Sequence, residues 1–380
     1  MGKKYKILIA PNSFKECSDS VTIAELIRDN LTGLKNADLI TKPISDGGDG
    51  FLNVCRFYFG GEIRKYSIST AYDETKFYCP ILYIESRKEI YIESAEVLGL
   101  KVVSLSYRNP LKLSSKGLGE LLLKIEEEIR NGRIEINEVF IGIGGTATID
   151  MGMGMMSKLG LKLLDSIGKE LNVIPESYLL TRSIDYNPMN FSFKVIPIVD
   201  ATNPLFGMKG GIRVFGNQKG ADEKTISILE KSFNHLLNLF IYNNLTVSSH
   251  NLSGAGGGIP SALQIFYKTG LVNSSNFIKN NLGIEKYSEE IKFLITGEGA
   301  YDSQSDSGKG VKTLLEMFKS DSWQMFLICG KISGSSFKNL PKNVFPIELL
   351  KYFENDKESI VNYKEGFEKA CKEVISQINF

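Results

Sequence analysis

Short apolar runs alternate with helical patterns near the amino terminus. The segment KYKILIAPNSF (4–14) predicts a buried strand that runs into a loop, and LITKPI (39–44) predicts a second strand. Between them, Asp19 or Ser20 can cap a helix. The apolar residues of this helix share one face: Val21, Ala24, Ile27 and Leu31. A further helix is expected after the second strand, through Phe51, Val54 and Phe57.

The carboxyl-terminal part repeats this arrangement. FLITGEG (293–299) and MFLICGK (325–331) predict buried strands, and GVKTLLEMF (310–318) predicts a helix between them. A terminal helix is expected around FEKACKEVISQI (367–378). Repeated strand, loop and helix units predict an α/β fold with a Rossmann-like doubly wound parallel sheet.

The middle of the chain has a different pattern. Residues 66–106 alternate polar and apolar positions, which is typical of strands in an antiparallel or mixed sheet. Later apolar runs are followed by glycine-rich loops. The simplest arrangement is a second α/β domain, 66–287, inserted into a discontinuous Rossmann-like domain made of 1–65 and 288–380.

Composition excludes several classes of partner. The net charge is +1, from 45 basic and 44 acidic residues, which argues against nucleic acid or an anionic membrane as the main partner. No apolar run approaches the roughly 18–20 residues that span a bilayer, and ILIA is too short for the core of a signal peptide. The five cysteines form no C-x-x-C pair, so we expect reduced thiols and a cytoplasmic location.

One glycine-rich loop allows two interpretations. In GIGGTATID (142–150), Gly142, Gly144 and Ala147 satisfy the dinucleotide pattern G-x-G-x-x-G/A, and Asp165 lies about 20 residues further on. This match favours a nicotinamide-dependent oxidoreductase. The alternative is a tight turn where a helix packs closely on a strand. The stripe Met151, Met155 and Leu159 is typical of a hydrophobic core.

Two other loops have candidate chemistry. GAGGG (254–258) can expose backbone N–H groups to an anion at a helix start, or can be a flexible turn. SDGGDG (45–50) contains Asp46, a candidate general base or metal ligand, and Asp49, which suits a helix cap. The two histidines, His235 and His250, lie outside these loops, so acid–base chemistry would fall to Asp, Glu or Lys.

The segment FLITGEGAYDSQSDSGKG (293–310) resembles a phosphate site but matches no standard phosphate motif. Ser303 and Gly310 break the P-loop pattern, and Asp302 breaks the dinucleotide pattern. Glycines, acids and a lysine at a strand end are nonetheless the components of phosphoryl transfer.

The chain resembles the bacterial type I glycerate kinase family along essentially its whole length. The matching segments occur in family order: KILIAPNSFK, PISDGGDG, ESAEVLGL, GIGGTATID, DATNPLFG with VFGNQKGA, GAGGG and ITGEGAYDSQSDSGK. The resemblance implies a Rossmann-like domain, a second α/β domain and an active site between them. It also implies ATP-dependent phosphorylation of a hydroxyl of D-glycerate, to 2- or 3-phosphoglycerate, with Mg²⁺. A homodimer is compatible with the sequence.

The resemblance assigns roles to particular positions. The expected catalytic residues are Asp46, Asp302 and Lys309, and the expected metal ligands are Asp302 and Glu298. Substrate contacts are expected at Asn12, Ser13, Lys15, Gly47, Gly48, Asp200 and Asn203. Nucleotide contacts are expected at Gly144, Gly145, Thr146, Gly256, Gly257 and Gly297.

The chain departs from the family pattern at several positions. Asn12 replaces Asp, Glu16 replaces Gly, Phe51 replaces Thr and Ala300 replaces Arg, while Ile149 and Met151 replace the Asn and Gly that flank Asp150. These departures keep two further alternatives open: a catalytically weakened relative with altered hydroxy-acid specificity, and a binding protein that retains the fold.

Overall fold

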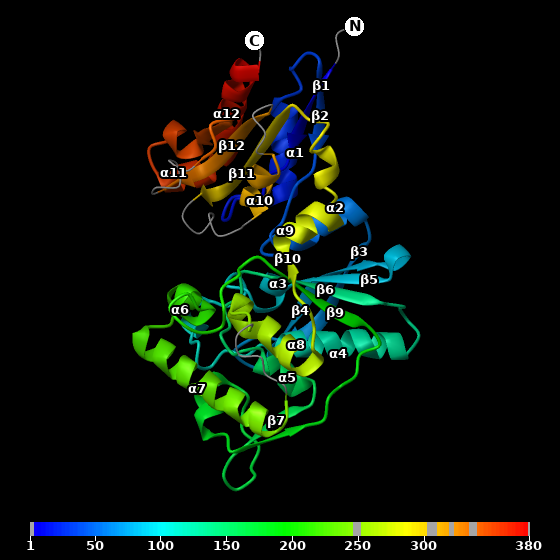
Figure 1. The fold of residues 1–380 in the computed structure, drawn as a ribbon, viewed down its shortest axis with the longest axis vertical. Helices are drawn as coiled ribbons and strands as arrows, with labels where there is room; N and C mark the ends of the chain where they lie inside the picture. The colour runs from blue at the N-terminus through cyan, green and yellow to red at the C-terminus, as the bar shows by residue number, and fades with distance from the viewer. Residues whose placement is uncertain (1–3, 246–251, 302–309, 319–322, 334–339, 379–380) are drawn as a thin grey trace. The chain divides into compact units, whose positions relative to one another are not determined.

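The computed structural model describes residues 4–245, 252–301, 310–318, 323–333 and 340–378. The chain forms two compact units (Figure 1), Met1–Tyr58 with Asn273–Phe380, and Phe59–Val272. The sequence pattern places the boundaries later, at 65/66 and 287/288. The first lies earlier because β3 (Glu62–Ser69) pairs with β4 (Lys76–Ile84) of the second unit. The second lies earlier because Phe277 packs on Phe51 of the first unit.

The first unit contains a parallel sheet in the order β13-β12-β11-β1-β2. Its strands are β1 (Tyr5–Ile9), β2 (Ala37–Thr41), β11 (Phe293–Tyr301), β12 (Gln324–Ile332) and β13 (Val344–Glu348). Each neighbouring pair is parallel. With strands counted along the chain of this unit, the order is 2-1-3-4-5, a common doubly wound order. The predicted fold class is confirmed.

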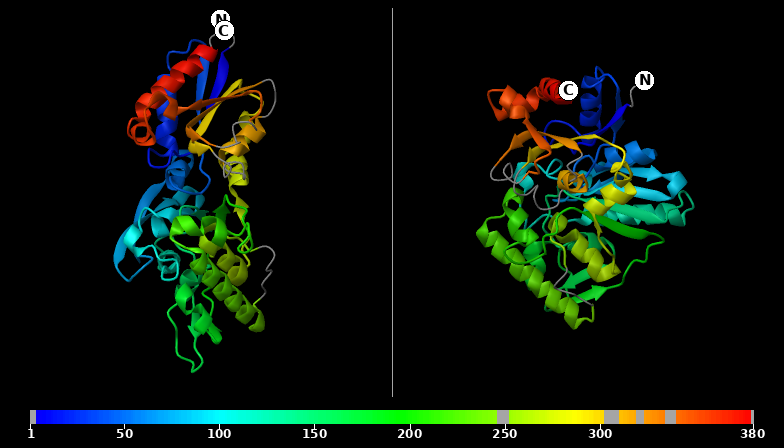
Figure 2. Two further views of the ribbon diagram at one scale, coloured as in Figure 1. Left: turned by 90° about the vertical axis from the view of Figure 1, so that its left-hand side faces the viewer. Right: turned by 45° about the horizontal axis from the view of Figure 1, so that its top comes forward.

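Helices cover this sheet. α1 (Ser20–Asn30) and α12 (Tyr363–Ile378) lie side by side on one face (Figure 2) and share a buried core with β1, β11 and β12. Asp19 caps α1 and accepts hydrogen bonds from the N–H groups of Val21 and Thr22, as the sequence predicts. The unit also contains the following helices: α2 (Phe51–Phe59, ending at the boundary), α9 (Ser274–Asn276), α10 (Gly310–Met317) and α11 (Asp356–Val361).

The second unit is built on a mixed sheet in the order β10-β9-β6-β5-β4-β3. Its further strands are β5 (Glu89–Glu93), β6 (Glu138–Ile143), β9 (Lys194–Val199) and β10 (Val272–Asn273), while β7 (Leu161–Leu164) and β8 (Ser183–Tyr186) form a separate pair. β3, β4 and β5 are antiparallel neighbours, and β5, β6 and β9 are parallel. The alternating pattern of 66–106 therefore predicts the antiparallel part correctly.

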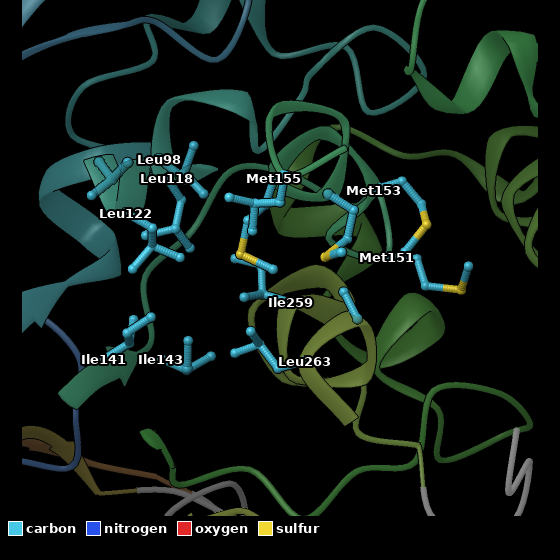
Figure 3. Packing of buried hydrophobic residues seen from close by; sticks show 14 of the residues in the cluster. Leu98, Leu118, Leu122, Ile141, Ile143, Met151, Met153, Met155, Ile259 and Leu263 are labelled. Atoms are coloured by element: carbon cyan, nitrogen blue, oxygen red, sulfur yellow. The ribbon is translucent and has the colours of Figure 1, made fainter. Parts of the chain in front are cut away.

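A continuous apolar core fills the second unit (Figure 3). Its helices are α3 (Ser94–Leu98), α4 (Lys116–Arg130), α5 (Met153–Lys158), α6 (Gly211–Gly216), α7 (Glu223–Tyr242) and α8 (Ile259–Tyr267). Met151, Met155 and Leu159 are completely buried in this core, which confirms their interpretation as core residues. Among the described residues, no helix combines the length and apolarity needed to cross a membrane.

Candidate functional site

The carboxyl ends of β1, β2 and β11 meet at one edge of the first unit's sheet. β1 has β2 on one side and β11 on the other. The chain leads from β1 to β2 in one direction and from β11 to β12 in the other. Ligands of doubly wound sheets bind beyond the strand ends where connections diverge in this way. The loops after β1 and β2, together with the carboxyl end of β11, therefore form the first candidate site.

Asp46, in the loop after β2, is half-buried and held by two donors. The Gly48 N–H donates to Oδ1 at 3.0 Å, and Nδ2 of Asn12 donates to Oδ2 at 3.4 Å. Asn12 is buried, and its own Oδ1 accepts from the Ser13 N–H at 2.8 Å. The Asn12 amide thus links the loops after β1 and β2. A carboxylate that is oriented and still partly exposed can accept a proton from a hydroxyl.

The loop after β1 lies directly on β11, and two glycines of that strand are closely packed. The Asn12 N–H donates to the Gly297 carbonyl at 2.8 Å. A Cβ at Gly297 would lie 1.7 Å from the Ile328 carbonyl oxygen, and a Cβ at Gly299 would lie 3.2 Å from the Lys15 nitrogen. Gly297 therefore has no room for a side chain, and a side chain at Gly299 would press on the loop after β1, whether or not a nucleotide contacts either position.

Some of the remaining predicted residues of this unit are described by the structure and others are not. Lys15 is exposed, Gly47 has a φ of 93°, and Glu298 is buried on β11. Asp302 and Lys309 lie outside the described residues. No group of three or more His, Cys, Asp or Glu side chains within the described ranges, which exclude Asp302, could hold a metal.

In the second unit, the loop after β6 is anchored to the element that follows β5. The Gly144 N–H donates to Oγ of Ser94 at 3.1 Å, and that hydroxyl lies 3.0 Å from the Gly144 carbonyl oxygen. The Ala147 N–H donates to the Leu98 carbonyl at 2.7 Å, and the Leu100 N–H to the Gly145 carbonyl at 3.0 Å. Segment 144–147 is therefore held in a defined conformation at a parallel strand end.

The GAGGG loop packs directly on the residues that flank this segment. A Cβ at Gly256 would lie 2.5 Å from Cγ2 of Ile143, and one at Gly257 would lie 2.0 Å from the Thr148 carbonyl oxygen. The Met151 N–H donates to the Gly257 carbonyl at 2.9 Å. The structure thus brings two sequence-predicted glycine loops together, and it gives Gly256 and Gly257 a packing role of their own.

Asp200 and Asn203 follow β9, the neighbour of β6. Nδ2 of Asn203 donates to the Lys209 carbonyl at 2.7 Å, and the Asn203 carbonyl accepts from the Gly254 N–H at 2.9 Å. Asn203 therefore connects the loop after β9 to the GAGGG loop. Asp200, which precedes Asn203 in the same loop, is half-buried.

The dinucleotide pattern lacks its structural context. Gly142 lies inside β6, and α5 begins only at Met153, well after Ala147. In the dinucleotide fold, the glycines lead directly into a helix whose N-terminus binds the pyrophosphate. Here Ala147 instead pairs with Leu98.

A buried polar cluster behind the loop was missed by sequence reasoning. Lys219 is 4% exposed, and its Nζ donates to Oγ1 of Thr146 and to the Thr148 carbonyl, each at 3.0 Å. Burial lowers the pKa of Lys219 to about 7, against the opposing charge of Asp150. Its signal in the sequence was VFGNQKGA, where a lysine between polar residues and glycine resembles a surface turn.

Asp150 is completely buried at the end of the same loop. Its Oδ2 accepts from the N–H and hydroxyl of Ser115, both at 2.7 Å, and from the Gly154 N–H at 3.1 Å. Its Oδ1 accepts from the Gly152 N–H at 3.1 Å. Burial raises the pKa of Asp150, and these four donors oppose that rise. The carboxylate therefore organises the turn into α5.

Known proteins resemble this chain along nearly its whole length. A model of the glycerate kinase family matches residues 7–379. Glycerate 2-kinase of Escherichia coli K12 is 34% identical over 310 residues, 80% of this chain and 79% of that protein. Glycerate kinase of Bacillus cereus (strain ATCC 10987 / NRS 248) is 30% identical over 344 residues, 86% of each. The chain belongs to the glycerate kinase family.

A solved structure agrees with this assignment. It is a Salmonella typhimurium LT2 protein, named as a candidate glycerate kinase 2, with a TM-score of 0.78 and 27% identity, and the match covers 99% of this chain and 98% of that one. As a member of the glycerate kinase family, the chain is an enzyme, a phosphotransferase. The oxidoreductase alternative is therefore excluded.

Two departures from the family pattern fall on left-handed backbone. Glu16 has a φ of 68° and Met151 a φ of 56°, and the family pattern has glycine at both positions. A side chain in this conformation costs roughly 1–2 kcal/mol, which glycine avoids. The structure thus explains the family's glycines as backbone requirements, and Met151 offsets the cost by being completely buried.

We expect Glu16→Gly to stabilise the protein by up to about 1 kcal/mol, because the exposed Glu16 loses little contact while its left-handed strain is relieved. The matched control is Glu25→Gly, exposed inside α1, which should destabilise by about 1 kcal/mol. Urea unfolding measures both values. A Glu16→Gly variant less stable than the parent protein would contradict the strain argument.

Stability should also depend on pH through Lys219. Its folded-state pKa of about 7 lies below its ordinary 10.5, so between these values the unfolded chain binds a proton that the folded chain lacks. Stability therefore rises with pH in this window, by at most about 1.4 kcal/mol per unit, and Lys219 contributes no slope below pH 7. Lys219→Met should remove this slope in urea unfolding between pH 7 and 10. An identical slope in both proteins would show that Lys219 titrates normally.

Proposed function

We propose that this chain transfers the γ-phosphoryl group of ATP to the 2-hydroxyl of D-glycerate, forming 2-phosphoglycerate and ADP. Membership of the glycerate kinase family supports the phosphoryl transfer. The position of the hydroxyl is supported by the relative named glycerate 2-kinase, which matches 80% of the chain. The observation that carries the chemistry is the Asn12–Asp46 pair at the diverging strand ends of the first unit.

Asp46 is the proposed general base. The hydroxyl oxygen of glycerate forms the new bond to the γ-phosphorus, the bond between that phosphorus and the β,γ-bridging oxygen breaks, and ADP leaves. The hydroxyl proton passes to the Asp46 carboxylate. The Gly48 N–H and the Asn12 amide fix the orientation of that carboxylate, so it does not have to be ordered during the reaction.

Lys15 is the proposed partner of the glycerate carboxylate. It is exposed in the loop that packs on Gly299 of β11, two and three residues after Ser13 and Asn12. A compact ammonium on a flexible stem suits a small acid that must enter and leave. Gly47, Gly48, Asp200 and Asn203 complete the proposed substrate contacts.

The nucleotide and metal assignments rest on donor chemistry. Mg²⁺ binds carboxylate oxygens, and Glu298, buried within β11 three residues before the strand ends, fits this requirement, with Asp302 as its proposed companion. When bound, Mg²⁺ would neutralise phosphate charge during transfer. Lys309 is the proposed cation for the transferred group. Gly144, Gly145 and Thr146, with Gly256, Gly257 and Gly297, are the proposed nucleotide contacts.

An ADP-release assay over a panel of small hydroxy acids tests the function, with product position determined by phosphorus NMR. Glycerate should be the preferred acceptor, with the phosphate on carbon 2. Preference for another hydroxy acid would support the altered-specificity alternative, and binding without turnover would support a binding protein. A product phosphorylated on carbon 3 would refute the proposed position.

Asp46→Asn should lower kcat by at least about 100-fold and leave the melting temperature nearly unchanged, because the amide keeps the shape of the side chain but cannot accept the proton. The matched control is Asp38→Asn, which removes the same charge from an exposed position on β2. Steady-state kinetics and thermal melting measure both. Near-normal turnover by Asp46→Asn would remove this residue from the mechanism.

Lys15→Met should raise the KM for glycerate by about 10-fold or more and change the KM for ATP much less, because it removes a charge-assisted contact to the acid. The control Lys35→Met removes an exposed lysine from the segment between α1 and β2. Initial rates with each substrate varied in turn separate the two constants. Equal rises in both would instead place Lys15 at the phosphates.

A further inference from the structure

Lys219 holds the loop after β6 through hydrogen bonds from a buried position. It ends a short 3₁₀ helix, Asn217–Lys219, and reaches Thr146 and Thr148 with its buried ammonium. The following residue, Gly220, has a φ of 91°, and a Cβ there would lie 2.8 Å from the Arg108 carbonyl oxygen. The turn that presents Lys219 is therefore fixed by close packing.

Arg108 extends this support to the segment that pairs with the loop. Its guanidinium donates to the Leu100 carbonyl at 2.6 Å and to the Val103 carbonyl at 3.0 Å. The Leu100 N–H in turn donates to the Gly145 carbonyl. Segment 144–148 is thus held both by Leu98–Leu100 and by Lys219.

Stability alone gives little reason for a cation here. Burial of an ammonium is costly unless it is paired, and Lys219 forms no salt bridge with a described carboxylate. Asp150 is the acid whose charge acts on it, yet the Asp150 oxygens are occupied by Ser115, Gly152 and Gly154. A methionine would fill similar space without this cost.

The exposed side of the same loop has an available donor. Gly145 is exposed with a φ of 64°, and its N–H donates to no residue in the described part of the chain. Thr146, the next residue, holds the Lys219 ammonium through its hydroxyl. A positive charge is therefore held by the residue next to a backbone donor that has no acceptor in the described part of the chain, and this arrangement favours an anion.

We propose that Lys219 is a positioning residue for anion binding: its buried ammonium holds segment 144–148 so that the Gly145 N–H is presented to a phosphate oxygen of the nucleotide. Lys219 does not touch the phosphate and acts through Thr146 and the Thr148 carbonyl. The identity of the anion as a nucleotide phosphate rests on the proposed function. The stabilisation of segment 144–148 by Lys219 is independent of that function.

The first experiment tests the support of the loop without any activity. Hydrogen exchange by mass spectrometry, on the full-length protein, compares the parent with Lys219→Met and with the control Lys224→Met, an exposed lysine on α7. Lys219→Met should speed exchange in peptides that cover 144–152 by about 10-fold or more, and Lys224→Met should not. Unchanged exchange in both variants would overturn the proposal, and so would an equal increase throughout the chain, which indicates general destabilisation.

The second experiment tests the anion. Lys219→Met should raise the KM for ATP by about 10- to 100-fold with little change in the KM for glycerate. In the parent protein, kcat/KM for ATP should fall as pH rises through the pKa of Lys219, near 7, and this limb should be absent from the variant. The charged groups next to Lys219 are Asp150 on the loop and Arg108, whose carbonyl packs against Gly220.

The outcomes separate the two proposals. Faster loop exchange with unchanged kinetics and pH profile would overturn the role of Lys219 in binding ATP. A parent protein that is inactive toward glycerate would refute the proposed function, while hydrogen exchange and ATP titration by calorimetry would still decide the role of Lys219. Weaker ATP binding by Lys219→Met than by Lys224→Met in that titration supports the inference, and equal binding overturns it.

Discussion

The parallel pairing of β1 with β11 is the constraint on which the first unit depends. It joins Ile7 to Phe293, Leu8 to Leu294 and Ile9 to Ile295, segments separated by the whole of the second unit. The pairing places β1 at the point where the connections of the sheet diverge. It also brings the loop of Asn12 against Gly297, and so fixes one side of the Asp46 carboxylate. Without this pair, the proposed base would keep only the Gly48 N–H of its own loop as a donor.

The second unit achieves order in a different way, by packing backbone on backbone. Gly256 and Gly257 bring one loop onto Ile143 and Thr148 with no room for a side chain. Polar groups enclosed by such packing need partners, because a buried polar atom without one is costly. The Asp150 carboxylate accepts a hydrogen bond from the Gly154 N–H in the turn into α5, and the Lys219 ammonium donates one to the Thr148 carbonyl. The buried charges of this unit therefore follow from its close packing, because they are the hydrogen-bond partners of the polar groups that the packing encloses.

Much of the fold was predictable because its signals are local. Apolar periodicity located β1, β11 and α12, and the Asp19 cap follows from residue type alone. The first domain boundary was predicted at 65/66, whereas the structure has it at 58/59. The difference arises because β3 begins with mostly exposed, polar residues that resemble a loop. The Asn12–Asp46 contact requires the strand order, and the burial of Lys219 requires the position of Thr146, 73 residues away. Neither is encoded in a local pattern.

The discontinuous first unit has a consequence for how the chain folds during synthesis. Phe59–Val272 is continuous in sequence and can complete its sheet as soon as it leaves the ribosome. β1 has to wait for β11, and at about 5–20 residues per second that delay is roughly 15–60 s. During this time Ile7, Leu8 and Ile9 expose an apolar strand that has β2 as a neighbour on one side only. Protection of that edge by a chaperone, rather than the final stability of the sheet, can then set the yield of folded enzyme.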